Sequence, residues 1–233
     1  MTRAQPASRA DYPEFYEIIE ELTGKAKLPL PKLYIVNDPA PNAFATGRNP
    51  RKAVVAVTSG LLSRLNYQEL EGVLSHELSH IKNYDMLVST VAVILVGFIS
   101  IASDILMRSA MLAPRSSNNR RSEVGFVTLL IIVGAILAPL AATLMRLAIS
   151  RQREFGADAS GARLTGHPEN LANALVKISQ FPQALRSANN TTAHLWFENP
   201  FGADSKKTPW IVRIFMTHPP VEKRIAALHS LDL

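Results

Sequence analysis

Two long apolar runs dominate the middle of the chain. Residues 86–103 (MLVSTVAVILVGFISIAS) and 125–145 (GFVTLLIIVGAILAPLAATLM) contain no charged residue. Each approaches the ~20 residues that a helix, rising ~1.5 Å per residue, needs to cross the ~30 Å hydrocarbon layer of a bilayer. Pro139 lies inside the second run, where a membrane helix tolerates it. We therefore predict a two-helix transmembrane hairpin over 86–145, with a polar loop over 105–124. The alternative is a pair of buried core helices in a soluble protein.

The segments on either side of the hairpin have the pattern of a folded domain. Apolar residues recur with helical spacing over 12–23, and two β-branched or alternating stretches, 32–36 and 53–58, predict short strands. Further helices are predicted after the hairpin, over 149–164, 169–179 and 221–231, with an irregular stretch around 181–210. The pattern indicates an α+β fold that is mainly helical and has a small sheet.

This pattern also predicts how the domain is divided along the chain. Residues 1–85 form its first part, with one helix, the small sheet and a further helix that ends just before the apolar runs. Residues 146–233 form its second part. The hairpin therefore interrupts one domain instead of separating two.

The strongest chemical signal lies on the helix that precedes the first apolar run. Asn66, with Glu69 three residues later, forms a capping box that starts this helix. His76 and His80, in the sequence His-Glu-Leu-Ser-His, lie one turn apart on one face, so both imidazoles can bind one Zn²⁺. Glu77 follows the first histidine and can accept a proton from a water molecule at the metal. The alternative is a surface helix with incidental histidines.

A third metal ligand is expected directly after the second apolar run. A catalytic zinc site keeps one position for water, so two histidines need one further carboxylate or histidine. Glu154 and Asp158 lie one helical turn apart on the same face. Glu154 could be the ligand, and Asp158 could accept the second N–H of a ligand histidine and hold its ring. The alternative is a solvated acidic pair balanced by Arg151 and Arg153.

Composition narrows the classes of protein only slightly. The 233 residues are 47% apolar and only 19% charged, which agrees with a membrane protein. The chain has no cysteine, so disulfides and thiolate metal sites are excluded. The net charge of +6 suits an anionic lipid surface as well as nucleic acid and does not decide the partner. The first 30 residues show no cleaved targeting segment.

Four segments in this order resemble the HtpX-like membrane zinc metalloproteases, relatives of the CAAX-prenyl proteases. They are Asn42-Ala43-Phe44-Ala45, His76-Glu77-x-x-His80, Glu154-Phe155-x-Ala157-Asp158 and Thr217-His218-Pro219-Pro220. The resemblance implies a zincin-type (gluzincin) catalytic domain with Glu154 as third ligand. It also implies a multi-pass protein of the cell (inner) membrane, with the catalytic domain on the cytoplasmic side and a role in stress response and protein quality control. These proteases usually carry a further hydrophobic hairpin before the region that begins here, so we expect a truncated or short member.

Residues 41–46 carry a further expectation about the substrate. This small, alternating, uncharged stretch suits an edge strand whose residues Asn42, Ala43, Phe44 and Ala45 could pair with an extended peptide. An ordinary turn is the alternative. The resemblance places the Asn42 amide near the substrate carbonyl and His218 across the cleft. Both could then donate to the oxyanion that forms when water attacks.

Together these observations predict a membrane-anchored zinc-dependent endopeptidase that acts on misfolded or membrane proteins. One Zn²⁺ per chain is held by His76, His80 and Glu154, and Glu77 is the general base. The partners are polypeptide substrates and the lipid bilayer, without nucleic acid, and the sequence does not predict an oligomeric state. One alternative is a non-catalytic membrane adaptor with a structural or vestigial zinc site, although an intact Glu77 argues against it. Another is a zinc hydrolase acting on a different bond.

Overall fold

The computed structural model describes residues 4–112, 121–181, 197 and 219–232 of the chain. They fall into two compact units, one formed by Met1–Leu87 with Ser150–Leu233 and the other by Val88–Ile149. We call the first the sheet-containing unit and the second the hairpin unit. All the residues of the candidate site described below belong to the sheet-containing unit.

A four-stranded sheet forms one layer of the sheet-containing unit. Its strand order is β1-β2-β4-β3, and the strands are β1 (Gln5–Pro6), β2 (Lys32–Val36), β3 (Ala43–Thr46) and β4 (Val54–Thr58). β2 and β4 are parallel, whereas β3 runs antiparallel to β4 with Ala45 opposite Val55. β2 and β4 confirm the two strands predicted from the sequence, and β3 is an edge strand as expected. The two-residue strand β1 was not predicted.

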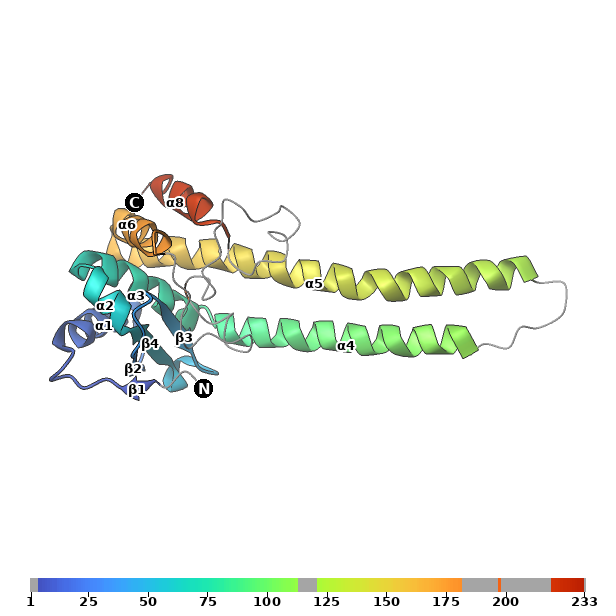
Figure 1. The fold of residues 1–233 in the computed structure, drawn as a ribbon, viewed down its shortest axis with the longest axis horizontal. Helices are drawn as coiled ribbons and strands as arrows, with labels where there is room; N and C mark the ends of the chain where they lie inside the picture. The colour runs from blue at the N-terminus through green and yellow to red at the C-terminus, as the bar shows by residue number, and fades with distance from the viewer. Residues whose placement is uncertain (1–3, 113–120, 182–196, 198–218, 233) are drawn as a thin grey trace. The chain divides into compact units, whose positions relative to one another are not determined.

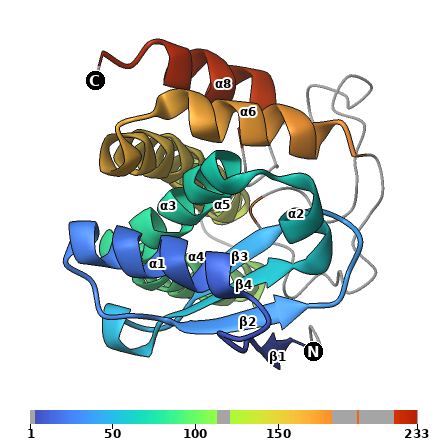
Figure 2. The same ribbon diagram turned by 90° about the vertical axis from the view of Figure 1, so that its left-hand side faces the viewer.

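Helices pack on the sheet in successive layers. They are α1 (Pro13–Ala26), α2 (Ser59–Arg64), α3 (Tyr67–Lys82), α6 (Pro168–Ser179) and α8 (Val221–His229), with a 3₁₀ turn, η1, over Pro50–Lys52. α3 contacts α1, β3 and α6, and α6 in turn contacts α8. Figure 2 shows α3, α6 and α8 stacked in this order away from the sheet. α3 is therefore the central helix of the unit, which explains why its residues are buried on nearly every side.

The start of α3 is set by a local signal, and its depth in the unit by a close approach to α5. The Asn66 side chain accepts a hydrogen bond from the backbone of Glu69 at 2.9 Å, and the Glu69 carboxylate accepts one from the backbone of Asn66 at 3.0 Å. This confirms the predicted capping box.

A Cβ placed on Gly161 of α5 (Arg121–Thr165) would lie only 3.0 Å from the backbone nitrogen of His76. A glycine at this point lets α5 approach α3 closely.

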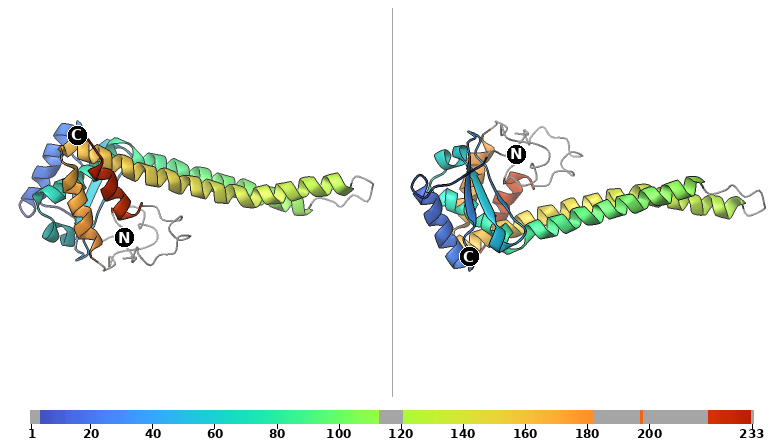
Figure 3. Two further views of the ribbon diagram at one scale, coloured as in Figure 1. Left: turned by 90° about the horizontal axis from the view of Figure 1, so that it is seen from above. Right: turned by 90° about the horizontal axis from the view of Figure 1, so that it is seen from below.

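The hairpin unit consists of the apolar parts of α4 (Asp85–Leu112) and α5, which run alongside each other in opposite directions (Figures 1 and 3). Over the most apolar 18 residues of each helix the mean hydropathy is 2.4, and only 6% of these residues are buried. Phe98, for example, is 73% exposed. The alternative of two core helices therefore does not fit, and both helices are long and apolar enough to span a bilayer.

The expectation about the segment between the apolar runs was wrong in part. The polar segment 105–124 was expected to be a loop, but α4 continues to Leu112 and α5 already begins at Arg121. Residues 149–164 are helical as predicted, and they form the end of the 45-residue helix α5. The physical reason is that residues 105–112 and 146–150 include good helix formers such as Met107, Arg108 and Arg146, and no proline or glycine interrupts either stretch.

A candidate metal centre between helices α3 and α5

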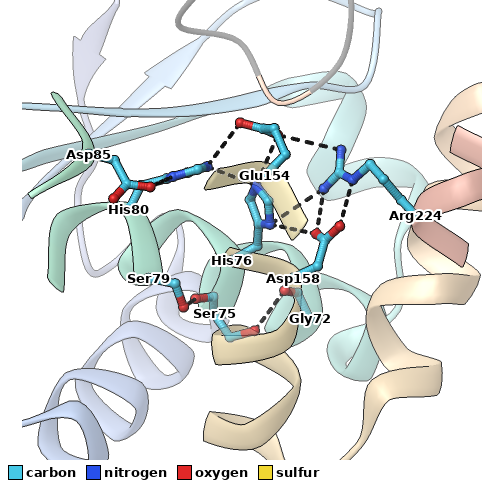
Figure 4. A network of polar contacts seen from close by, with 9 residues as sticks. All are labelled: Gly72, Ser75, His76, Ser79, His80, Asp85, Glu154, Asp158 and Arg224. Atoms are coloured by element: carbon cyan, nitrogen blue, oxygen red, sulfur yellow. Dashed lines mark hydrogen bonds and ion pairs between the residues drawn. The ribbon is translucent and has the colours of Figure 1, made fainter. Parts of the chain in front are cut away.

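Three side chains from two helices bring donor atoms together (Figure 4). The Nε2 atoms of His76 and His80, both on α3, lie 3.0 Å apart. Glu154 on α5 places one carboxylate oxygen 3.8 Å from His76 Nε2 and the other 3.5 Å from His80 Nε2. Two ligand atoms bound ~2.0–2.1 Å from a tetrahedral zinc ion lie about 3.3 Å apart. The three separations are close to this value.

The protonation of the two rings makes this arrangement specific for a cation. His76 Nδ1 lies 2.8 Å from Asp158 Oδ1, and His80 Nδ1 lies 2.5 Å from Asp85 Oδ2. Because a carboxylate accepts, each Nδ1 carries a hydrogen, and in the neutral form of each ring Nε2 carries a lone pair. In that form the two lone pairs face each other at 3.0 Å, and a cation bound between them removes their repulsion. The donor set therefore fits a metal ion.

Burial keeps His76 in the neutral form that a metal requires. The ring is fully buried, and this desolvation lowers the pKa of His76 to about 4, although the hydrogen bond to Asp158 raises it in part. Neutral imidazole is the form that ligates a metal ion. The ring therefore offers its lone pair over the whole physiological pH range.

Each of the two histidines is held by a carboxylate, and each carboxylate by an arginine. Arg224 of α8 donates to both oxygens of Asp158, from Nε at 2.8 Å and from Nη2 at 2.7 Å. Arg153 of α5 donates from Nη2 to Asp85 Oδ1. Figure 4 shows the Arg224–Asp158–His76 chain and the carboxylate of Asp85 beside His80. Outer partners of this kind orient the ligand rings and raise their basicity.

The two acidic residues of α5 are both deeply buried. Glu154 and Asp158 are 6% and 2% exposed. The alternative of a solvated acidic pair therefore does not hold. Asp158 was expected from the sequence to hold a ligand histidine, and its contact with His76 agrees with that prediction. Asp85, Arg153 and Arg224 were not assigned to the site, although Asp85 could have been noticed as a lone acid between the histidine helix and the apolar run.

Glu77 lies in the interior beside this donor set. It is 2% exposed, and this burial, together with the nearby Glu154, raises the pKa of Glu77 to about 7. The positive charge of a protonated His80, a hydrogen bond from the backbone N–H of Ala45 and the positive charge of Arg224 lower this pKa in part. A cation held by the neighbouring ligands would also lower this pKa, because positive charge favours the carboxylate. Glu77 can therefore both accept and release a proton near neutral pH.

The strand predicted to bind substrate lies beside Glu77. Asn42, directly before β3, donates its backbone N–H to Thr58 Oγ1 at 2.9 Å, and its side-chain oxygen accepts from the N–H of Ala43 at 3.0 Å. Ala45 contacts Glu77 as described above. The structure thus brings this strand to the centre through Ala45. His218, predicted to lie across the cleft, is outside the described residues.

Phe197 is a further residue at the site that the sequence did not predict. Its backbone N–H donates to the carbonyl oxygen of Ala43 at 2.8 Å, on the edge of β3 that faces away from β4. Its ring meets the His76 ring edge to face, with centroids 5.0 Å apart, and lies 4.8 Å from the Arg224 guanidinium carbon. No local pattern marks Phe197, because its partners come from three other segments of the chain.

A helix that carries His-Glu-x-x-His, a glutamate from a second helix and two long exposed apolar helices define a membrane metalloprotease. Comparison of the sequence with known families agrees with this class. The profile of peptidase family M48 matches residues 10–232, and the chain belongs to this family.

Curated relatives that are named as proteases match nearly the whole chain. The protease HtpX homolog of Dictyoglomus turgidum is 47% identical over 224 residues, which are 96% of this chain and 71% of that protein. The protease HtpX homolog of Syntrophobacter fumaroxidans is 46% identical over 99% of this chain and 80% of its own length. Together with the family match, these relatives confirm the predicted membrane metalloprotease and do not favour the adaptor.

A solved structure shows a similar fold. The crystal structure of S. mikatae Ste24p superimposes with a TM-score of 0.63 at 20% sequence identity, over 97% of this chain. The chain spans about half of that protein, 52% of its length. This similarity supports the mainly helical fold with a small sheet.

Proposed function

We propose that this protein is a zinc-dependent endopeptidase with a zincin-type site, and that it hydrolyses peptide bonds of misfolded or membrane polypeptides. The observation that carries the proposal is the convergence of His76, His80 and Glu154 beside the buried carboxylate of Glu77. A structural zinc site closes its fourth position with a protein ligand and needs no general base. A buried carboxylate next to three ligands is what a hydrolytic site requires.

In this proposal His76, His80 and Glu154 hold one Zn²⁺ per chain. The bound ion supplies Lewis acidity, which lowers the pKa of water toward ~7 and polarises the carbonyl of the scissile bond. Asp158 and Asp85 keep the proton on Nδ1 of each ligand histidine, so that both Nε2 lone pairs stay available. The two buried carboxylates thus act on the rings and do not touch the substrate.

Glu77 carries the proton through the reaction. One of its carboxylate oxygens takes a proton from the attacking water, whose oxygen forms the new bond to the carbonyl carbon. The same carboxylate oxygen of Glu77 then delivers this proton to the nitrogen of the scissile amide as its C–N bond breaks. The N–H of Ala45 orients the carboxylate for both transfers and connects it to the strand on which the substrate would lie.

The substrate is proposed to pair with the outer edge of β3 as an additional antiparallel strand. Main-chain pairing tolerates many sequences, which suits a protease that acts on misfolded chains. Because the carbonyl of Ala43 already accepts from Phe197, we place the first substrate hydrogen bond at the carbonyl of Ala45. Asn42 Nδ2 and His218 are proposed as donors to the oxyanion of the transition state.

The cellular setting follows from the apolar helices and the relatives. We propose that the two helices anchor a multi-pass protein in the inner membrane, with the sheet-containing unit on the cytoplasmic side. The relatives named protease HtpX homolog and the resemblance to that family support a role in membrane-protein quality control under stress.

The decisive experiment measures casein hydrolysis and bound metal on the same samples of full-length protein in detergent micelles. The wild type should cleave casein, lose activity with a chelator and regain it with one equivalent of zinc. Glu77→Gln should keep the zinc but lose about 10²–10⁴-fold in activity, the usual contribution of a general base. Glu169→Gln changes an exposed glutamate of α6 and serves as control. Normal cleavage by the Glu77 variant, or loss of its zinc, would contradict the assignment.

A further inference from the structure

The hydrogen-bonded residues that hold the two ligand histidines differ in how deeply they are buried in the unit. The chain Arg224–Asp158–His76 lies wholly in the interior. The chain Arg153–Asp85–His80 lies nearer the surface, with side chains 20%, 9% and 16% exposed. His80 also depends on residues that start or continue the two apolar helices, because Asp85 is the first residue of α4 and Arg153 is on α5.

The two oxygens of Asp85 are divided between two donors. Oδ2 accepts from His80 Nδ1, and Oδ1 accepts from Arg153 Nη2. A carboxylate held at one oxygen can still rotate about its side-chain bonds, whereas one held at both is fixed. Arg153 therefore determines how firmly Asp85 holds the ring of His80.

Arg153 also directly precedes Glu154 in the sequence. Its ion pair with Asp85 fixes the stretch of α5 that presents the Glu154 carboxylate, at the point where this stretch faces the start of α4. The geometry points to Arg153 as a positioning residue of the metal centre, acting through Asp85 on His80 and tying the first residue of α4 to the stretch of α5 that follows its apolar run. This inference rests on the proposed metal site.

The first test compares two arginines of α5. Arg163 is exposed, and no ion pair or hydrogen bond of its side chain is found among the described residues, so Arg163→Gln is the matched control for Arg153→Gln. Zinc is titrated into the chelator-treated full-length protein in micelles against a competing dye. Arg153→Gln should bind zinc about ten-fold more weakly, the lower end of the effect of losing an outer partner. Arg163→Gln should bind as the wild type does.

Two spectroscopic readouts separate positioning from general damage. Co²⁺ bound in place of zinc has visible d–d bands that depend on ligand geometry, and Arg153→Gln should change them while Arg163→Gln should not. In zinc-free protein with ¹⁵N-labelled histidine, Arg153→Gln should shift the His80 signal away from the Nδ1–H form and leave His76 unchanged. Arg153→Lys, which keeps the charge, should recover part of the affinity even if the Gln variant folds poorly.

A double variant tests the route through Asp85. Asp85→Asn alone should weaken zinc binding about 10–100-fold. If Arg153 acts through Asp85, adding Arg153→Gln to Asp85→Asn should cost little more. An equal loss in both backgrounds, or unchanged affinity and Co²⁺ bands in Arg153→Gln, would overturn the inference while leaving the metal site intact. A wild type that binds no zinc would overturn the proposed function as well.

Discussion

The backbone N–H of Ala45 donates a hydrogen bond to the carboxylate of Glu77. Through this bond the edge strand β3 and the central helix α3 meet at the proposed general base. The bond favours the ionised carboxylate, but burial opposes it more strongly, so the pKa of Glu77 remains raised to about 7. The carboxylate is therefore held in place at a cost in folding stability.

This cost predicts a pH-dependent effect of Glu77→Gln on the zinc-free protein. The pKa of Glu77 is about 7 in the folded state against an ordinary value of 4.5. Between these values the folded state binds more protons than the unfolded state, so the Glu77 contribution to stability falls as pH rises. The variant should therefore gain in melting temperature over the wild type, and the gain should be larger above the folded pKa than near 4.5. Thermal unfolding in chelator at several pH values measures this, and a gain independent of pH would contradict it.

The two acids of α5 should differ in their effect on metal binding. Glu154→Ala removes a ligand and should abolish most zinc binding, whereas Asp158→Ala loosens only the ring of His76 and should cost about 10–100-fold in affinity. Zinc titration of both variants gives the order. Equal and negligible effects would place the third ligand elsewhere, with His218 the next candidate.

Arg224 should matter mainly for folding stability. It is fully buried and pairs with the buried Asp158, so Arg224→Met leaves one carboxylate without this partner. Breaking a buried pair in this way typically destabilises a protein by about 3–5 kcal/mol. Lys223→Met, at an exposed position of the same helix, is the control and should have little effect. Denaturant unfolding in micelles compares the two, and equal stability of both variants would show that the pair contributes nothing.

The apolar helices should insert into the bilayer. We expect the full chain to resist carbonate extraction and to need detergent. A Gly/Ser linker in place of residues 88–149 should give a more soluble protein that still binds zinc. The structure favours this cut over 86–145, because Met86 and Leu87 belong to the sheet-containing unit and residues 146–149 belong to the hairpin unit. A monodisperse full chain without detergent would argue against a membrane protein.

The proposed oxyanion donor His218 can be tested by kinetics alone. His218→Ala should lower kcat by about 10²–10³-fold, the range for loss of one oxyanion donor, because the interaction forms mainly in the transition state. KM and zinc content should change little. Full kcat, or a defect due entirely to lost zinc, would remove His218 from this role.

The sequence by itself determined the features that depend on near neighbours in the chain. The capping box at Asn66, the one-turn spacing of His76 and His80, strands β2 and β4, and the two apolar runs were all predicted and found. Each depends on backbone propensity, capping or hydrophobic periodicity within a few residues. Glu154 and Asp158 were also suggested by their one-turn spacing, which places them on one face of a helix.

Only the tertiary structure decided which partners hold the site together. Arg224 lies 66 positions after Asp158, and the two meet because α8, which packs on α6, brings Arg224 to the part of α5 that carries Asp158. Arg153 entered the sequence analysis only in the alternative, as a charge balancing Glu154 and Asp158, but it pairs with Asp85, 68 positions earlier in the chain. Contacts of this kind arise when helices are buried against one another. The spacing of residues along the chain therefore does not predict them. The physical reason is that a buried charged side chain pairs with whichever oppositely charged group the packing of the helices places beside it.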